Sequence, residues 1–267
     1  MHVERYGYGG PTVVLLHGFG TTSFLWRRIA PALAISGHTV FAPDLFGYGA
    51  SDRPFDADFG IRAQSQYIRR LFDTLAIARP TFVACDLGAV IALRTAFDQP
   101  ESVGRMLLIS PSSIRDLPGS QIRLMQRETA RHVIRLVQGL FGAEPLIRLL
   151  LETSLVDPAE LSPRLVGRFV APYLGRDGVN HFLGLARALE DEDTSDVTLA
   201  SIQHHILILR GEADRWCSAR YAERLSGELP NAQLQTVPDA GRLLSEELPN
   251  VLVAAIQSQT AQRVTLV

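Results

Sequence analysis

The feature that most constrains the fold is an apolar run that turns sharply into a small-residue segment in the first third of the chain. Residues 81–85 read Thr-Phe-Val-Ala-Cys, which is typical of a buried strand, and a helical segment is expected from residue 89. Asp86 stands between them, with Ala84 two positions before it and Gly88 two positions after it. Small neighbours let a strand and a helix approach closely around a strained turn. The stretch therefore predicts a nucleophile elbow that holds out the Asp86 side chain.

Two other interpretations of this turn can be weighed from the residues. Aspartate is also typical of the position that caps the N-terminus of a helix. Cys85 is a second possible nucleophile, but Val83 and Leu87 lie two positions before and after it and are too bulky for such a turn. A functional Asp86 is favoured because a carboxylate under apolar cover carries a desolvation cost. Cys85 is expected to pack as a small buried thiol.

Short apolar runs alternate with helical segments over most of the chain. The expected strands are 11–16, 38–42, 81–85, 106–110, 206–209 and 233–237. The expected helices between the early strands are 29–35, 64–75 and 89–98. This alternation predicts an α/β fold with a mostly parallel, doubly wound sheet and helices on both faces.

The alternation stops between residues 111 and 196. This stretch reads as several helices, broken at Gly119, Gly142, Pro158, Pro163 and Pro172. The sequence therefore predicts a core made of residues 1–110 and 197–267, with residues 111–196 inserted as a helical cap. The cap is expected over the carboxyl edge of the sheet, where open α/β sheets place their active sites.

Composition excludes several classes of function. The 267 residues carry a formal net charge of −2, which gives no electrostatic case for a nucleic-acid or anionic-membrane partner. All 26 basic residues are arginine, so lysine Schiff-base chemistry is excluded. Two cysteines are too few for a disulfide framework. With no signal-like opening and no long apolar run, we expect a cytoplasmic protein.

No cofactor or metal is expected from the motifs. The chain has no HExxH sequence and no paired cysteines or histidines at ligand spacing. The glycines at Gly18 and Gly20 do not make a dinucleotide fingerprint. The expected partner is a small-molecule substrate, and the protein is expected to be a monomer or a homodimer.

With these elements in order, the chain resembles the α/β-hydrolase superfamily over nearly its whole length. Four segments besides the Asp86 elbow carry the resemblance. They are the oxyanion-loop-like 17–20, the structural turn 44–51, the acid-loop-like 211–214 and the histidine-loop-like 239–249. The resemblance implies that the amides of Phe19 and Leu87 form an oxyanion hole and that Asp214 is the acid of a triad. It places Arg242 where the family has its catalytic histidine.

An aspartate at the elbow is similar to the epoxide hydrolase and haloalkane dehalogenase branches of this superfamily. In those branches the carboxylate attacks carbon, and a histidine activates water to cleave the resulting ester. This chain departs from both patterns, because Leu87 follows the aspartate and Tyr173 is the only tyrosine of the expected cap. The candidate substrate contacts are His17, Trp26, Tyr173 and His181.

Arg242 leaves two hypotheses open. A guanidinium stays protonated at working pH and cannot be a general base. It either joins Asp86 and Asp214 in a salt bridge, or it orients a substrate carboxylate, enolate or phenolate while Asp86 transfers a proton.

These residues predict an enzyme that performs non-hydrolytic acid/base chemistry, such as elimination, isomerisation or cyclisation, on a small, partly apolar molecule. One alternative is an epoxide or haloalkane hydrolase whose base has moved to His181. Another is a non-catalytic ligand-binding protein. The sequence does not identify the substrate.

Overall fold

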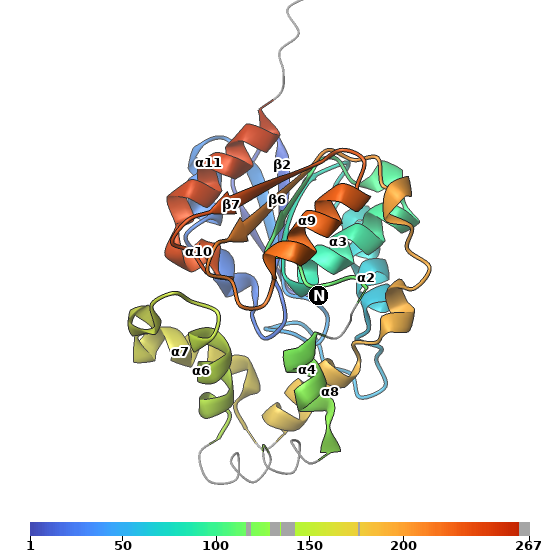
Figure 1. The fold of residues 1–267 in the computed structure, drawn as a ribbon. Helices are drawn as coiled ribbons and strands as arrows, with labels where there is room; N and C mark the ends of the chain where they lie inside the picture. The colour runs from blue at the N-terminus through green and yellow to red at the C-terminus, as the bar shows by residue number, and fades with distance from the viewer. Residues whose placement is uncertain (116–118, 129–133, 135–141, 176, 262–267) are drawn as a thin grey trace, which may run out of the picture.

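The computed structural model describes residues 1–115, 119–128, 134, 142–175 and 177–261. A seven-stranded sheet has the order β1-β3-β2-β4-β5-β6-β7 (Figure 1). The strands are β1 (Val3–Tyr6), β2 (Thr12–Leu16), β3 (Thr39–Pro43), β4 (Thr81–Cys85), β5 (Met106–Ile109), β6 (Ile206–Gly211) and β7 (Ala232–Val237). β1 pairs antiparallel with β3, and every other pairing is parallel. The predicted doubly wound, mostly parallel sheet is confirmed.

Burial explains why these runs form strands. Every residue of β3, β4, β5 and β6 is buried, as a parallel sheet covered on both faces requires. All six expected strands are present, with ends that differ by a few residues. The edge strand β1 was not predicted, because its four residues include Glu4 and Arg5 and none of them is fully buried.

Helices cover both faces of the sheet (Figure 1). On one face α2 (Ile61–Thr74) packs against α3 (Leu87–Asp98), and on the other α1 (Ala30–Ile35) packs against α11 (Pro249–Thr260). α9 (Ala219–Glu228) contacts β6 and β7, and the short α10 (Leu244–Glu247) precedes α11. Within the described residues, no helix combines the length and the apolar character needed to cross a bilayer.

The chain between β5 and β6, residues 110–205, is called the helical insertion below. Its described helices are α4 (Ser120–Gln126), α6 (Glu144–Glu152), α7 (Pro163–Val170) and α8 (Gly178–Arg187), followed by 3₁₀ turns at Asp191–Thr194 and Leu199–Ser201. No strand is found among its described residues. Of the expected helix breakers, Pro163 stands in the first turn of α7 and Gly142 has a positive φ of 70°.

Two contacts, one from Arg53 and one from Arg242, place the helical insertion over the carboxyl edge of the sheet. Arg53 Nη1 donates to the Pro172 carbonyl oxygen at 2.6 Å, and its Nη2 donates to Gly49 O at 2.8 Å. The amide of Arg242 donates to Ser154 O at 2.9 Å. Gly49 and Arg53 follow β3 and Arg242 follows β7, so these contacts lie beyond the carboxyl ends of parallel strands. The division into two domains at residues 110/111 and 196/197 stays a prediction.

Candidate active site

Asp86 occupies a strained turn between β4 and α3. Its φ of 50° and ψ of −118° fall outside the regions that ordinary residues prefer, at a cost of about 1–3 kcal/mol. A Cβ at Gly88 would collide with the carbonyl oxygen of His17, and one at Gly18 would lie 2.6 Å from Asp86 Cβ. The close approach expected from the small residues is therefore present. Asp86 occupies the N-cap position of α3, but its side chain makes no capping hydrogen bond to the helix.

The Asp86 carboxylate accepts hydrogen bonds at both oxygens. Its Oδ2 accepts from the Phe19 amide at 2.8 Å and from Arg242 Nη2. Its Oδ1 accepts from the Ser112 hydroxyl. The residue is only 3 % exposed, so these donors replace water as the stabilisers of a buried anion. The amide expected to bind a substrate oxyanion is thus bonded to Asp86 itself.

Arg242 lies in the loop between β7 and α10 and is 2 % exposed. Besides Asp86, its guanidinium donates to Ser154 Oγ at 3.1 Å and to Phe19 O at 3.3 Å. It also stacks on the Trp216 ring, with Cζ 4.4 Å from the ring centroid. Its Nε is buried without a hydrogen-bond partner among the described residues. The cation is therefore held by one carboxylate, two neutral oxygens and an aromatic face.

Asp214 follows β6 and does not form the second half of the expected bridge. Its Oδ1 accepts from the amides of Trp216 at 2.7 Å and Cys217 at 3.1 Å, whereas its Oδ2 has no partner in the described part of the chain. The ion pairs between described residues join Arg242 to Asp86 and not to Asp214. Burial raises the pKa of Asp214, while the nearby Ser110 side chain, the two amides and the charge of Arg242 oppose this rise. The hypothesis that Arg242 bridges both carboxylates is therefore wrong for Asp214, because the amides of Trp216 and Cys217 in its own loop hold the Asp214 carboxylate.

His17 is a structural residue of the loop that carries Phe19. Its Nδ1 donates to Gly18 O at 2.9 Å, and its Nε2 accepts from the Leu45 amide at 3.0 Å. The ring is therefore the neutral Nδ1–H tautomer, and burial lowers its pKa. With both nitrogens used, His17 ties the Phe19 loop to the turn after β3 and cannot also bind a ligand through either nitrogen.

The two candidate aromatic contacts are both buried. Trp26 is 1 % exposed, and its Nε1 has no partner among the described residues. Tyr173 is also 1 % exposed, its hydroxyl is likewise unpaired there, and burial raises its pKa. The Tyr173 ring meets Phe182 edge-on at 4.9 Å, and Phe182 lies 5.0 Å from the Phe19 ring. Tyr173 therefore belongs to an aromatic cluster that reaches the Phe19 loop.

His181 does not contact Asp86 in the structure. Its Nε2 donates to the carbonyl oxygen of Gly47 at 2.6 Å, and its ring meets Phe59 edge-on at 5.6 Å. Burial lowers its pKa. A relocated base at His181 would have to work through Nδ1 alone, and no contact brings it to the elbow.

Three residues at the site were not anticipated from the sequence. Ser112 donates to Asp86, Ser154 accepts from Arg242, and Trp216 stacks on the same cation. Ser112 follows β5, the strand beside β4, so its position at the same sheet edge was a usable signal. Ser154 follows α6 in the helical insertion, and its approach to Arg242 depends on tertiary packing.

The cysteines offer no competing nucleophile. Cys85 and Cys217 are both buried free thiols, and burial raises the pKa of each to about 12. A thiol with such a pKa holds little thiolate at neutral pH. Cys85 therefore packs as expected. In addition, no group of histidine, cysteine and acidic side chains among the described residues could hold a metal ion.

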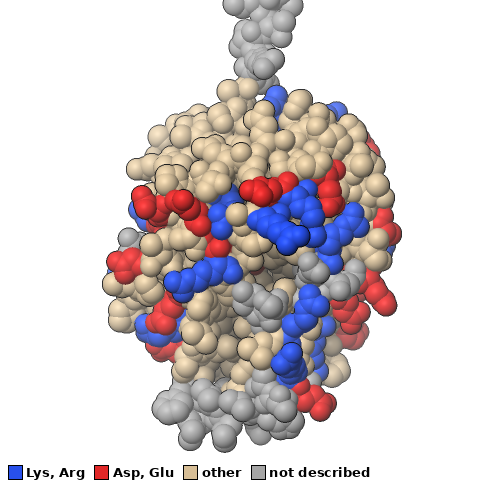
Figure 2. Space-filling view, in the orientation of Figure 1, with Lys and Arg blue, Asp and Glu red and all other residues tan. Residues whose placement is uncertain are grey.

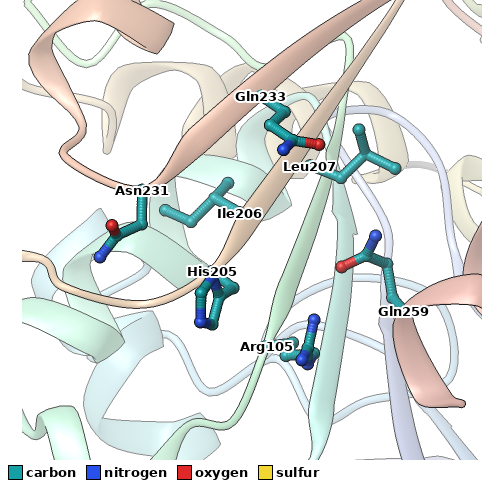
Figure 3. A pocket seen from close by; sticks show the side chains of 7 residues that line it. All are labelled: Arg105, His205, Ile206, Leu207, Asn231, Gln233 and Gln259. Atoms are coloured by element: carbon teal, nitrogen blue, oxygen red, sulfur yellow. The ribbon is translucent and has the colours of Figure 1, made fainter. Parts of the chain in front are cut away.

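The face in Figure 2 is hollowed between the sheet-bearing part of the molecule and the helical insertion, with arginine side chains beside the hollow. A separate cavity of about 380 Å³ lies elsewhere (Figure 3). Its lining includes Arg105, His205 and Asn231, each of which immediately precedes a strand. This cavity is therefore at the amino edge of the sheet, opposite the edge that holds Asp86.

The fold agrees with comparisons to known proteins. Residues 11–249 match the family model for the alpha/beta hydrolase fold, and the chain belongs to this family. An uncharacterised protein of Mycobacterium tuberculosis is 31 % identical over 211 residues, which cover 78 % of this chain and 56 % of the relative. A haloalkane dehalogenase of Mycobacterium marinum is 38 % identical over 108 residues, covering 40 % of this chain and 36 % of the enzyme. The match thus spans little more than half of the first relative and about a third of the second.

Solved structures extend the similarity to nearly the whole chain. An alpha/beta hydrolase fold protein from Burkholderia ambifaria superposes with a TM-score of 0.85 at 30 % identity, covering 96 % of this chain and 93 % of that one. A haloalkane dehalogenase from Bradyrhizobium elkani gives a TM-score of 0.82 at 24 % identity, with 97 % and 92 % covered. The second likeness shows the fold alone. The relatives thus include haloalkane dehalogenases, as the aspartate elbow led us to expect.

Proposed function

We propose that this protein is an α/β-hydrolase-fold enzyme that transfers a proton within a small, partly apolar substrate without hydrolysing it. Asp86 is the acid/base, and Arg242 stabilises the negative charge that develops on a substrate oxygen. The observation that carries the proposal is the buried contact between Arg242 and Asp86. In the family pattern, the position of Arg242 belongs to the histidine that activates water.

Two-step hydrolysis lacks a base in this arrangement. An ester formed on Asp86 is cleared only when a nearby group takes a proton from water. Arg242 cannot do so because its guanidinium remains protonated. His181 is bonded to Gly47 instead of lying against Asp86. An alkylated Asp86 would therefore persist.

Proton transfer is consistent with a site in which the Asp86 carboxylate lies directly beside the Arg242 cation. Asp86 Oδ2 accepts hydrogen bonds from both Arg242 Nη2 and the Phe19 amide. A substrate carbonyl oxygen that takes the place of Oδ2 on these donors leaves the carboxylate free to remove a proton from the neighbouring carbon. The electron pair of that C–H bond then becomes an enolate whose oxygen faces Arg242. Return of the proton to another carbon is isomerisation, and loss of a leaving group is elimination.

The test is exchange of carbon-bound hydrogen in D₂O. We expect the protein to accelerate deuterium incorporation next to the carbonyl group of small ketones such as cyclohexanone and acetophenone, measured by proton NMR. Asp86→Asn should reduce this acceleration by about a hundredfold or more, since it removes the acid/base. Arg148→Gln, a substitution at a partly exposed position on α6, is the control and should leave the rate unchanged. If the Asp86→Asn variant and the unaltered protein exchange at equal rates, the proposal fails.

Intact-protein mass after incubation with epoxides and alkyl halides separates this chemistry from a stalled hydrolase. The acid/base proposal expects no added mass. A persistent adduct on Asp86 would show a working nucleophile and would overturn it.

One observation favours a second candidate, a non-catalytic ligand-binding protein. Both oxygens of Asp86 are already hydrogen-bonded to the protein itself, through Phe19, Arg242 and Ser112. Under this alternative the pair stabilises the pocket only. Ligand affinity without turnover, unchanged by Asp86→Asn, would support it.

A further inference from the structure

A second pocket lies beside the candidate site. It has a volume of about 540 Å³, within the usual range for small-ligand sites. It is lined by Ser113, Trp216, Ser218, Arg220, Tyr221 and Arg224. Ser113 follows β5, Trp216 and Ser218 follow β6, and the others belong to α9. Since Asp86 follows β4, the pocket opens at the same carboxyl edge of the sheet.

Two contacts connect this pocket to Asp86 and Arg242. Trp216, which lines the pocket, carries the Arg242 guanidinium over its ring. Ser113 is the neighbour of Ser112, whose hydroxyl donates to Asp86. The pocket and the candidate site therefore share a wall.

The charge around the pocket is positive. Arg220 forms no ion pair with any described residue, and the ion pair of Arg224 with Glu228 is long, at 3.7 Å. The Arg224 guanidinium also lies over the Tyr221 ring, with Cζ 5.7 Å from the ring centroid. Glu228 also lies 3.5 Å from Arg115, so this one carboxylate is shared by two arginines. The described lining contains no acidic side chain. Figure 2 shows basic side chains gathered on this face where Figure 1 places α9.

The aromatic walls are fixed in position. The Tyr221 hydroxyl donates to Ser112 O at 2.9 Å and accepts from the Ile114 amide at 3.1 Å. Its side chain therefore cannot swing away from the pocket without breaking two hydrogen bonds. Trp216 is held through Arg242 and through its amide, which donates to Asp214. Flat, rigid faces bind planar rings, while arginine forks bind carboxylates.

We propose that this pocket binds a small aromatic carboxylate. The aromatic ring lies against Trp216 and Tyr221, and the carboxylate pairs with Arg220 and Arg224. The inference names the substrate class of the proposed enzyme and in that sense rests on the proposed function. Binding itself does not require Asp86.

Tryptophan fluorescence reports on the pocket directly, with benzoate as the probe. The two tryptophans differ, because Trp26 is buried and Trp216 is partly exposed. We expect benzoate to quench the emission saturably, and Trp216→Phe to abolish the change. Arg220→Gln and Arg224→Gln should each raise the dissociation constant by about tenfold, the size expected for loss of one charge-assisted hydrogen bond. Benzamide, which has the same ring without the charge, should bind at least about fivefold more weakly.

The matched control is Arg105→Gln, which removes an exposed arginine from the cavity at the opposite edge of the sheet (Figure 3). It should leave benzoate affinity unchanged. If Arg105→Gln and Arg220→Gln weaken benzoate binding equally, the effect comes from the overall charge of the protein, and the proposal is overturned. Equal affinity for benzamide and benzoate, or quenching that survives Trp216→Phe, would also overturn it. The Asp86→Asn variant keeps the two proposals separable, since it should bind benzoate normally even where ketone exchange is lost.

Discussion

Replacing Arg242 with methionine should destabilise the protein strongly. The side chains of Arg242 and Asp86 are only 1 % and 5 % exposed, so the carboxylate cannot regain water when its cation is removed. Removing one partner of such a buried pair costs about 3–5 kcal/mol of unfolding free energy. Methionine fills most of the space, which keeps the cavity contribution small. The loss of unfolding free energy therefore measures the cost of leaving the Asp86 carboxylate buried without its cation.

The other corners of the double-mutant cycle give the pairwise contribution. Asp86→Asn alone should cost less, about 1–3 kcal/mol, because Arg242 keeps Ser154 Oγ, Phe19 O and the Trp216 ring as partners. The double variant has no buried charge left at this position. It should be more stable than the sum of the two single losses implies, with an interaction energy of about 1–3 kcal/mol.

Urea unfolding followed by circular dichroism measures these differences. For a chain of this size, we expect the midpoint of the Arg242→Met variant to fall by about 1–2 M at an unchanged slope. The control is Arg148→Met, which removes an exposed pair with Glu144 at 2.9 Å and should change stability by less than about 0.5 kcal/mol. A similar small change for Arg242→Met, or strict additivity in the double variant, would refute the argument that the pair is buried and coupled.

Three further predictions follow from the contacts of the site. Ser112→Ala should lower the unfolding free energy by about 1.5–3 kcal/mol, since it removes a donor to the Asp86 carboxylate; an unchanged urea midpoint would contradict this. Gly88→Ala should cost about 1–3 kcal/mol because its Cβ meets His17 O, and a neutral result in thermal unfolding would show that α3 can shift. Burial raises the pKa of Asp214, so the native state binds this proton more tightly than the unfolded chain does, and stability is lost as pH rises from the ordinary value of 3.8 through the raised pKa. Asp214→Asn should therefore become more stable relative to the unaltered protein as the pH rises above 3.8 toward neutrality, and the opposite trend would reverse the assigned sign.

The fold could be predicted because its central strands are buried on both faces. Continuous apolar runs such as 106–109 have no solvated side, so they stand out from any helical pattern. β1 gave no such signal, since it contacts the sheet only through β3 and keeps charged residues. The helices of the insertion could be anticipated as a group, but their packing could not.

The site was predictable to the extent that its residues follow strands. Asp86 and Arg242 were found because each occupies a fixed place in the order of motifs. The Arg242–Asp214 pair was expected from the same order and is absent, because hydrogen bonds within the 214–217 turn decide where that carboxylate points. Ser154 could not be predicted from the sequence, because it reaches Arg242 through the docking of α6 against the loop after β7.

That docking makes the loop of Arg242 and the end of α6 one mechanical unit. Ser154 accepts from Arg242 through both its carbonyl and its hydroxyl oxygen. The Glu247 carboxylate bridges the two segments again, accepting from the amides of Val156 at 2.6 Å and Gly241 at 2.7 Å. Lifting this end of the helical insertion would therefore pull on the cation that faces Asp86. Movement of residues 152–157 away from the sheet would therefore also disturb the buried ion pair between Arg242 and Asp86.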